Sequence, residues 1–293
     1  MNPNDHNIFI ILDSLPPRAI KTWIKRHDDL LDYTAEHYAY FSQRRSQLID
    51  ELKQALSANT VPFEFKNWKR IVSQEFSNTP LHTVGSIKSY PGGRFNIGEI
   101  DSKRFPKFPA LYMAEDTKTA YVEMMGISPD MGSDGLTGNE LAVAVNFSHF
   151  IISGNLTSIL DLTNPKSLQQ FYSQIKQIKL PIYFKNRAAK LKISQMQPVE
   201  SLEKLRKTIF AEDWRLMPMQ FDSPANSQII GQIAHSAGIE GILYPSVKTN
   251  KRAIAIYPEN FINSEAFVEI KGNVADTVRD KKIDKNTYKK YLP

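Results

Sequence analysis

The apolar residues of the first sixty positions recur at the spacing of an amphipathic helix. They follow one another at intervals of three, four and seven residues, and they are Leu31, Tyr38, Phe41, Leu48, Leu52 and Leu56. Pro16 and Pro17, after Asp13 and Ser14, are typical of a helix entry. The pattern predicts helices over residues 15–58. They pack on the rest of the chain or, in a second interpretation, bind a partner.

Beyond residue 59 the helical periodicity stops, and the sequence shows both strand-like and helix-like patterns. The segment "NTVPFEF" places a subdomain boundary near residues 59–75. Strands are predicted at "NELAVAVNF", "GIEGILYPS" and "KRAIAIYP", and helices at "DTKTAYVEMMG", "PKSLQQFYSQIKQI" and "NSQIIGQIAHSAG". This alternation with long connections predicts an α+β fold of three parts. They are a helical extension over residues 1–75, a main domain over 76–270 and a basic tail over 271–293.

Composition narrows the class of protein. Apolar residues make up 41% and charged residues 23% of the 293 positions, which is ordinary for a globular protein. The chain has no cysteine, which excludes disulfides, cysteine-ligated zinc and a cysteine nucleophile. The apolar run Ile8–Leu12 is short and preceded by Asp5, so we expect neither a signal peptide nor a membrane span. The cytoplasm is the expected location.

Positive charge is concentrated in two segments. The net charge is +6, and residues 271–293 alone carry seven Lys or Arg against three Asp, which is +4. A second basic segment, "KSLQQFYSQIKQIKLPIYFKNRAAKLKISQMQ", spreads its lysines at helical spacing. We interpret both as solvated surfaces. A nucleic-acid surface is the alternative, and its binding would depend on salt.

The candidate chemistry lies in three short motifs. "GGRFN" is neither a P-loop nor a dinucleotide fingerprint, but its glycines allow close approach of a ligand and Arg94 offers a planar fork for phosphate. "ALYMAEDTKTAYVE" predicts a strand ending near Tyr112, a turn with Asp116 as N-cap, and a helix that carries Glu123. Ser246 lacks a nucleophile elbow, so it is predicted to bind rather than attack. Taken alone, Arg94, Tyr112 and Glu123 are each better explained by a structural role.

The histidines do not predict a metal centre. None of the six is paired with a second ligand at a spacing such as His-Glu-x-x-His. We therefore expect no bound metal and no resident cofactor.

In their order along the chain, these motifs resemble the RES domain, a family named for an arginine, a glutamate and a serine. The resemblance covers residues 80–261 and rests on "GGRFN", "ALYMAEDTKTAYVE" and "GILYPS", followed by "RAIAIYPENF". It implies a fold like that of the ADP-ribosyltransferase toxins, with a mixed β core and flanking helices. It also implies an enzyme of a bacterial toxin–antitoxin pair that degrades NAD⁺.

The resemblance implies a set of site residues. Arg94, Tyr112 and Glu123 would be catalytic, and Phe95, Asn96 and Ser246 would join Arg94 and Tyr112 in binding NAD⁺, the substrate. Phe95 departs from relatives that carry tyrosine or tryptophan there, so a hydroxyl contact is missing. An antitoxin or immunity protein is the implied partner. The resemblance does not distinguish a toxin that an antitoxin restrains within the same cell from an effector that is delivered into another cell.

The chemistry of NAD⁺ suits these residue types. Arg94 would bind phosphate, Tyr112 would stack on nicotinamide, and Glu123 would stabilise the positive charge that develops on the ribose. One carboxylate suffices, because the ring nitrogen of nicotinamide is positively charged in NAD⁺ and nicotinamide departs as a neutral molecule. Its departure therefore needs no general acid. The acceptor is water or phosphate. The alternatives are ADP-ribosylation of a protein and a non-catalytic module that binds nucleic acid or protein.

Overall fold

The computed structural model describes residues 16–101, 103–125, 147–193 and 198–293. Most of the predicted strand "NELAVAVNF" lies outside these residues. The chain divides into two compact units. The smaller unit comprises residues 1–44 and 178–198, and the larger comprises residues 45–177 and 199–293.

The described residues of the smaller unit form two helices that pack through aromatic side chains. They are α8 (Ile182–Leu191) and most of α2 (Pro17–Gln47). Tyr33 of α2 is fully buried in a cluster with Phe184 and Ala188 of α8. Glu36 accepts a hydrogen bond from the hydroxyl of Tyr183, at 3.0 Å, and forms an ion pair with Arg187. This arginine holds the pKa of the Glu36 carboxyl below its usual range.

The helices of the larger unit include those predicted from the sequence. They are α3 (Ile49–Ser57), α4 (Val84–Lys88), α5 (Thr117–Met125), α7 (Gln169–Ile175), α9 (Leu202–Ile209), α10 (Leu216–Phe221) and α11 (Asn226–Ser236). Short 3₁₀ turns occupy residues Gln74–Phe76, Pro258–Phe261 and Tyr288–Tyr291. The predicted N-terminal helical region is confirmed over the described residues, with a break at Leu48. Leu52 and Leu56 of the predicted stripe are fully buried.

A single mixed sheet forms the core of the larger unit. Its strands are β1 (Thr60–Ser73), β2 (Leu111–Ala114), β3 (Phe147–Asp161), β4 (Gly241–Pro245), β5 (Arg252–Ile256), β6 (Phe267–Lys271) and β7 (Lys282–Ile283). They pair in the order β1-β2-β5-β4-β3-β6-β7, and β1 pairs with β3 as well. Among these described strands, the pairing of β3 with β4 is parallel and the other pairings are antiparallel.

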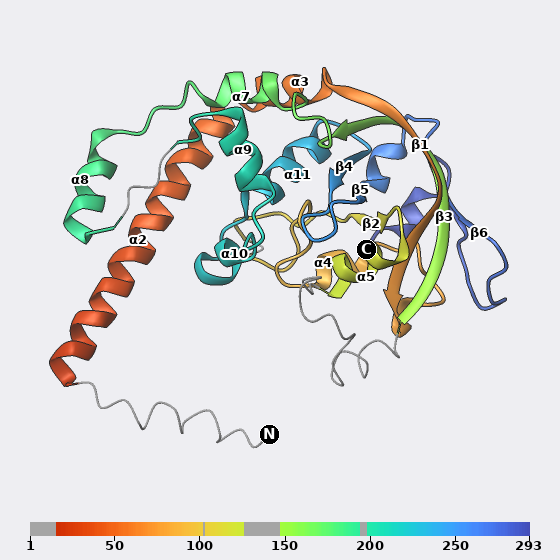
Figure 1. Cartoon of the computed structure of the whole chain (residues 1–293), viewed down its shortest axis with the longest axis horizontal. Coiled ribbons are helices and arrows are strands. Elements are labelled where there is room, and N and C mark those ends of the chain that lie inside the picture. The colour runs from red at the N-terminus through yellow and green to blue at the C-terminus, as the bar shows by residue number, and fades with distance from the viewer. Residues whose placement is uncertain (1–15, 102, 126–146, 194–197) are drawn as a thin grey trace. The chain divides into compact units, whose positions relative to one another are not determined.

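The second pairing of β1 closes five strands into a ring. The ring runs β1-β2-β5-β4-β3 and returns to β1, and β6 and β7 extend from β3. β1 and β3 are long, curved and paired along most of their length (Figure 1). β4 and β5 are short and almost wholly buried, because their "GILYP" and "RAIAI" sequences lie in the interior of the sheet. The α+β class, the mixed β core with flanking helices and the N-terminal helix are thus confirmed.

The structure divides the chain differently from the sequence-based boundaries. The predicted helical extension over residues 1–75 includes β1, which is fourteen residues long and belongs to the central sheet. The division into units falls at residues 44 and 45. β1 reads as a boundary in the sequence because Pro62 and several charged residues interrupt its apolar alternation.

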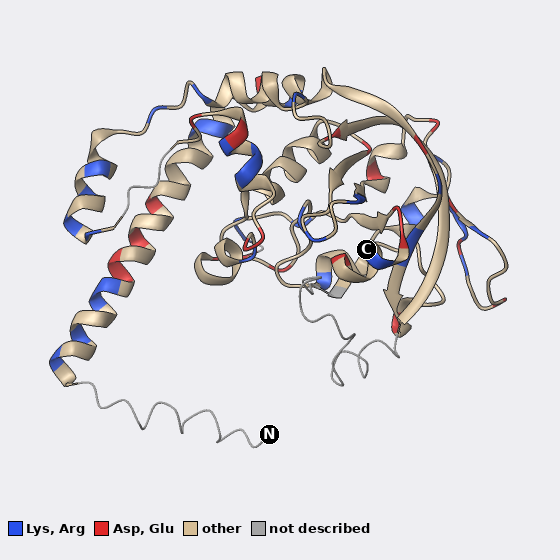
Figure 2. Cartoon of the chain, in the orientation of Figure 1, with Lys and Arg blue, Asp and Glu red and all other residues tan. Residues whose placement is uncertain are grey.

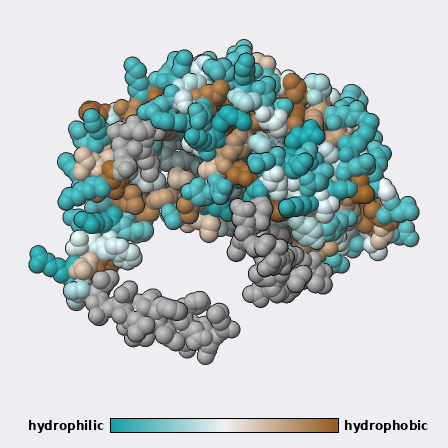
Figure 3. Space-filling model, viewed as in Figure 1, coloured by the Kyte–Doolittle hydropathy of each residue, from teal (hydrophilic) through white to brown (hydrophobic). Residues whose placement is uncertain are grey.

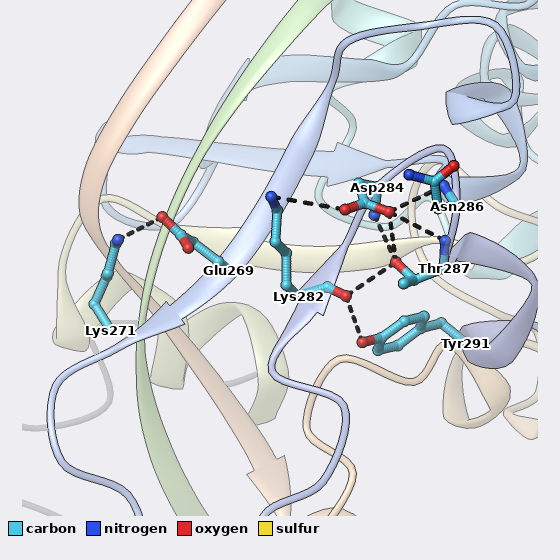
Figure 4. Close-up of polar contacts among 7 residues, drawn as sticks. All are labelled: Glu269, Lys271, Lys282, Asp284, Asn286, Thr287 and Tyr291. Atoms are coloured by element: carbon cyan, nitrogen blue, oxygen red, sulfur yellow. Dashed lines mark hydrogen bonds and ion pairs between the residues drawn. The ribbon is translucent and has the colours of Figure 1, made fainter.

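The basic segment 271–293 is part of the larger unit and not a separate tail. Ile283, Tyr288 and Tyr291 are buried in the main core cluster. Tyr291 donates its hydroxyl to the carbonyl of Lys282 at 2.6 Å, and Asp284 accepts hydrogen bonds from the turn that follows it (Figure 4). The apolar and aromatic residues between the lysines therefore hold this segment on the sheet.

Basic and acidic side chains are interspersed over the described surface. Figure 2 shows Lys and Arg on several elements, with Asp and Glu among them. Three lysines near the C-terminus form ion pairs with acidic neighbours, namely Lys271 with Glu269, Lys282 with Asp284 and Lys285 with Glu265. Hydrophilic residues cover much of the face shown in Figure 3. No helix among the described residues has the length and apolar character needed to cross a bilayer.

Candidate functional site

The "GGRFN" loop turns sharply and packs against Tyr112 of β2. Gly92 has a φ of +97°, a conformation that favours glycine. A Cβ on Gly93 would lie 2.4 Å from the Tyr112 hydroxyl, so only glycine allows the ring to sit this close. The sequence suggested that these glycines admit a ligand. They also admit a tyrosine that faces the site.

Asn96 fixes the position of Tyr112. It is fully buried, and its Oδ1 accepts hydrogen bonds from the Tyr112 hydroxyl and from the Gly93 amide, both at 2.9 Å. The Phe95 amide donates to the same hydroxyl at 3.0 Å. Burial raises the pKa of Tyr112 well above its usual value. Tyr112 therefore presents a neutral ring to the site, with its hydroxyl engaged by the protein.

Phe95 belongs to the core. Its ring is fully buried, with its centre 4.8 Å from that of Tyr244, and its carbonyl accepts a hydrogen bond from the Tyr257 hydroxyl at 2.8 Å. A Cβ on Gly231 of α11 would lie 2.2 Å from the same carbonyl, so α11 also packs closely on this residue. The structure thus places Phe95 and Asn96 behind the site rather than on its wall.

A buried glutamine of α11 forms hydrogen bonds with the backbone of the "GGRFN" loop. The Nε2 of Gln228 lies within hydrogen-bonding distance of the carbonyls of Pro91, Gly93 and Asn96, at 2.9, 3.3 and 3.0 Å. Gln228 is fully buried. Sequence reasoning missed it, although a polar residue within the apolar run "NSQIIGQI" is the available signal.

Glu123 lies on α5, and its carboxylate accepts hydrogen bonds from two hydroxyl groups. Thr119 donates its amide to Asp116 at 2.8 Å, so the predicted N-cap that starts this helix is confirmed. Ser246 donates its hydroxyl to Oε1 of Glu123 at 2.6 Å, and Tyr244 donates to Oε2 at 3.4 Å. Ser246 is fully buried, whereas Glu123 is half-buried. Ser246 therefore orients the carboxylate from behind, and Tyr244 is a site residue that the sequence did not single out.

Arg94 is buried and partly engaged by the protein. Its Nη1 donates to the carbonyls of Ile209 and Ala211, at 3.1 and 2.9 Å. Among the described residues, no other nitrogen of this side chain makes a hydrogen bond. Burial lowers the pKa of Arg94 from its usual value, and Glu123 acts in the opposite direction. Arg94 thus joins the "GGRFN" loop to the segment after α9.

These side chains meet at a cavity of about 460 Å³, which is within the usual range for small-molecule sites. Of the predicted residues, Arg94, Tyr112 and Glu123 line it, and Phe95, Asn96 and Ser246 do not. Among the described residues, five Lys and Arg residues and two carboxylates line it, and they are Lys69, Arg70, Arg94, Arg215 and Lys248 with Glu123 and Glu212. Trp214 and Tyr244 add aromatic surface.

The arrangement suits an anionic ligand that carries a flat ring. Positive charge and aromatic surface favour phosphates and heterocycles. Glu123, held by two hydroxyls at the wall, can stabilise positive charge that develops on a bound molecule. No group of three or more potential metal ligands occurs among the described residues.

Comparison with known proteins yields limited similarity. No protein-family model matches the chain, and no curated protein matches it. A solved structure with similarity to the chain belongs to the MbcT–MbcA toxin–antitoxin complex of M. tuberculosis. The two chains are 15% identical with a TM-score of 0.44, over 82% of this chain and 96% of the other. The functional assignment therefore rests on the residues of the site.

Proposed function

We propose that this protein cleaves the bond between nicotinamide and ribose in NAD⁺, as a RES-like enzyme with an ADP-ribosyltransferase-like core. The observation that carries the proposal is the carboxylate of Glu123, held by Ser246 at the wall of a cavity shared with Arg94 and Tyr112. These four residues come from the three motifs on which the family resemblance rests. They lie far apart in the sequence and converge at one place.

The proposed reaction needs charge stabilisation more than proton transfer. As the C–N bond breaks, nicotinamide takes the bonding electron pair and leaves as a neutral molecule, while positive charge grows on the ribose. The Glu123 carboxylate stabilises that charge. An oxygen of water or inorganic phosphate then bonds to the same carbon. Water loses a proton to solvent and gives ADP-ribose, whereas an anionic oxygen of hydrogen phosphate neutralises the positive charge and gives the 1-phosphate ester.

The remaining residues bind and orient the substrate. The ring of Tyr112 offers a surface for nicotinamide, and its engaged hydroxyl keeps that ring in place. Arg94 would contact a phosphate of NAD⁺ at the cavity wall. Loss of NAD⁺ would harm the cell in which the enzyme acts, so we propose a neutralising partner protein and action in the cytoplasm.

The proposal is tested by incubating the purified protein with NAD⁺ and following nicotinamide and ADP-ribose by chromatography. We expect equal release of nicotinamide and of a soluble ADP-ribosyl product, with added phosphate showing whether the product is ADP-ribose or its 1-phosphate. Radiolabel transferred from NAD⁺ to protein would instead support protein ADP-ribosylation. Absence of nicotinamide release by the folded protein would contradict the proposal and favour a binding module.

Replacing Ser246 with alanine should lower kcat about tenfold and leave KM nearly unchanged. The hydroxyl contacts Glu123 and does not line the cavity, so its loss misorients the carboxylate without removing a contact to substrate. Steady-state nicotinamide release at varied NAD⁺ measures both constants. Ser173→Ala on α7 is the matched control, because this exposed hydroxyl donates only to its own helix. A rise in KM with unchanged kcat would make Ser246 a substrate-binding residue instead.

Replacing Arg94 with alanine should raise KM for NAD⁺ about tenfold or more, and affect kcat less. The change removes a phosphate-binding group and the link to Ile209 and Ala211. Arg94→Lys should recover little, since an ammonium cannot reproduce the planar fork. Steady-state nicotinamide release at varied NAD⁺ measures KM and kcat of both variants, and circular dichroism confirms that they are folded. An unchanged KM would refute Arg94 as a phosphate-binding residue.

A further inference from the structure

Two arginines of the cavity contact one indole ring. Trp214 follows α9 and is almost fully buried, with 6% of its surface exposed. The guanidinium carbon of Arg215 lies 4.5 Å from the centre of this ring, and that of Arg94 lies 5.6 Å from it. Both distances are within the range of cation–π interaction. The three side chains therefore form one group at the cavity wall, which we call the Trp214 cluster.

The two arginines of the Trp214 cluster differ in what they contact. Arg94 is buried and donates to the carbonyls of Ile209 and Ala211, just ahead of Trp214 in the sequence. It therefore positions the segment that carries the tryptophan. Arg215 is exposed, and within the described part of the chain its guanidinium makes no hydrogen bond. Stacking on Trp214 restricts the orientation of Arg215 and leaves its donors available to a ligand.

Electrostatics favours a ligand with more than one negative charge. Arg215 lines the cavity although the residue as a whole is exposed, and desolvation lowers the pKa of its guanidinium from the usual value. Desolvation lowers the pKa of Lys248, which also lines the cavity, and the positive charges of Arg215 and Arg94 lower it further. Glu123 acts on all three in the opposite direction. The two carboxylates of the cavity wall, Glu123 and Glu212, are outnumbered by its Lys and Arg side chains, which leaves positive charge in excess.

We propose that Arg215 is the second phosphate-binding residue of this cavity and that the Trp214 cluster takes the pyrophosphate of a nucleotide. Arg215 provides a fork of donors to one phosphate, Trp214 fixes the plane of that fork, and Arg94 holds the segment in place. The inference rests on the proposed function, because NAD⁺ contains a pyrophosphate. It also stands as a statement about binding alone, since a nucleoside diphosphate offers the same group.

The test is isothermal titration calorimetry with ADP, inorganic pyrophosphate and adenosine on wild type and on Arg215→Gln. We expect the substitution to weaken ADP and pyrophosphate binding about tenfold or more, and to leave adenosine binding unchanged. Arg215→Lys should recover the charge but only part of the affinity. Arg279→Gln is the matched control, because it removes the same charge from an exposed position that does not line the cavity.

The outcomes separate this inference from the proposed function. ADP affinity of Arg215→Gln within twofold of wild type, in a folded protein, would overturn the assignment even if wild type releases nicotinamide from NAD⁺. An equal loss in Arg279→Gln would also overturn it, because the effect would then follow net charge and not the site. Arg215-dependent ADP binding without nicotinamide release would support the inference and contradict the proposed function. Weakening of adenosine as strongly as of ADP would place Arg215 at the nucleoside and refute the phosphate role.

Discussion

Glu123→Gln should reduce the rate of nicotinamide release by roughly 10²-fold or more, which is about 3 kcal/mol of transition-state stabilisation. The amide keeps the shape of the carboxylate. It can still accept from Ser246, and it can donate to the oxygen of Tyr244, where the carboxylate now accepts. Only the negative charge is lost. NAD⁺ affinity should therefore change far less than turnover.

Chromatography of nicotinamide and calorimetry of NAD⁺ binding measure the two quantities separately. Glu51→Gln on α3 is the control, since it neutralises an exposed carboxylate that is not part of the cavity wall. Turnover of Glu123→Gln within threefold of wild type would remove Glu123 as the catalytic carboxylate. A comparable loss in the control would assign the effect to net charge instead.

Gln228→Ala should lower the free energy of unfolding by about 2–4 kcal/mol. The substitution removes the side-chain donor shared by the carbonyls of Pro91, Gly93 and Asn96, of which the first two also accept from backbone amides. It also opens a small void beside the loop. Because Asn96 and Gly93 position Tyr112, the folded fraction should also lose turnover. Urea unfolding followed by circular dichroism gives the stability, and nicotinamide release gives the activity.

Two further variants isolate the cause. Gln228→Met keeps most of the volume, so its loss of stability reports mainly the hydrogen bonds. Gln232→Ala changes the same residue type one turn along α11, where the side chain makes no hydrogen bond within the described residues, and should cost less than about 0.5 kcal/mol. Equal stabilities for Gln228→Ala and Gln232→Ala would show that Gln228 does not hold the loop.

The sequence predicted those elements whose pattern is local. β4 and β5 are short apolar runs, and α5 begins at an aspartate cap, so neighbouring residues suffice to identify them. β1 was missed because its sequence mixes charged residues and a proline with apolar ones. In addition, its main partner is β3, and the paired residues lie from 74 (Ser73 with Phe147) to 100 (Thr60 with Leu160) positions apart in the sequence. The segment 271–293 was predicted as a separate tail because lysines dominate its sequence. The few buried residues that hold it on the sheet, such as Ile283, Tyr288 and Tyr291, do not form a recognisable pattern.

The same distinction between local and distant information applies to the site. Motif order identified Arg94, Tyr112 and Glu123, which line the cavity. It could not show that Ser246 contacts Glu123 and not the cavity, since that depends on how β4 meets α5. Trp214 and Arg215 lie outside the motifs, and the hydrogen bonds of Arg94 to Ile209 and Ala211 connect their segment to the site.

The closed ring of five strands has a consequence for synthesis on the ribosome. β5 and β4 stand between β2 and β3 in the ring, yet they are the last of its strands along the chain. The ring can close only after residue 256 has emerged, because chains are made from the N-terminus. Glu123 meets Ser246 only at that stage, so a nascent or prematurely terminated chain lacks the assembled carboxylate site. The topology thus delays the appearance of the site until all five strands of the ring, through Ile256, have been translated.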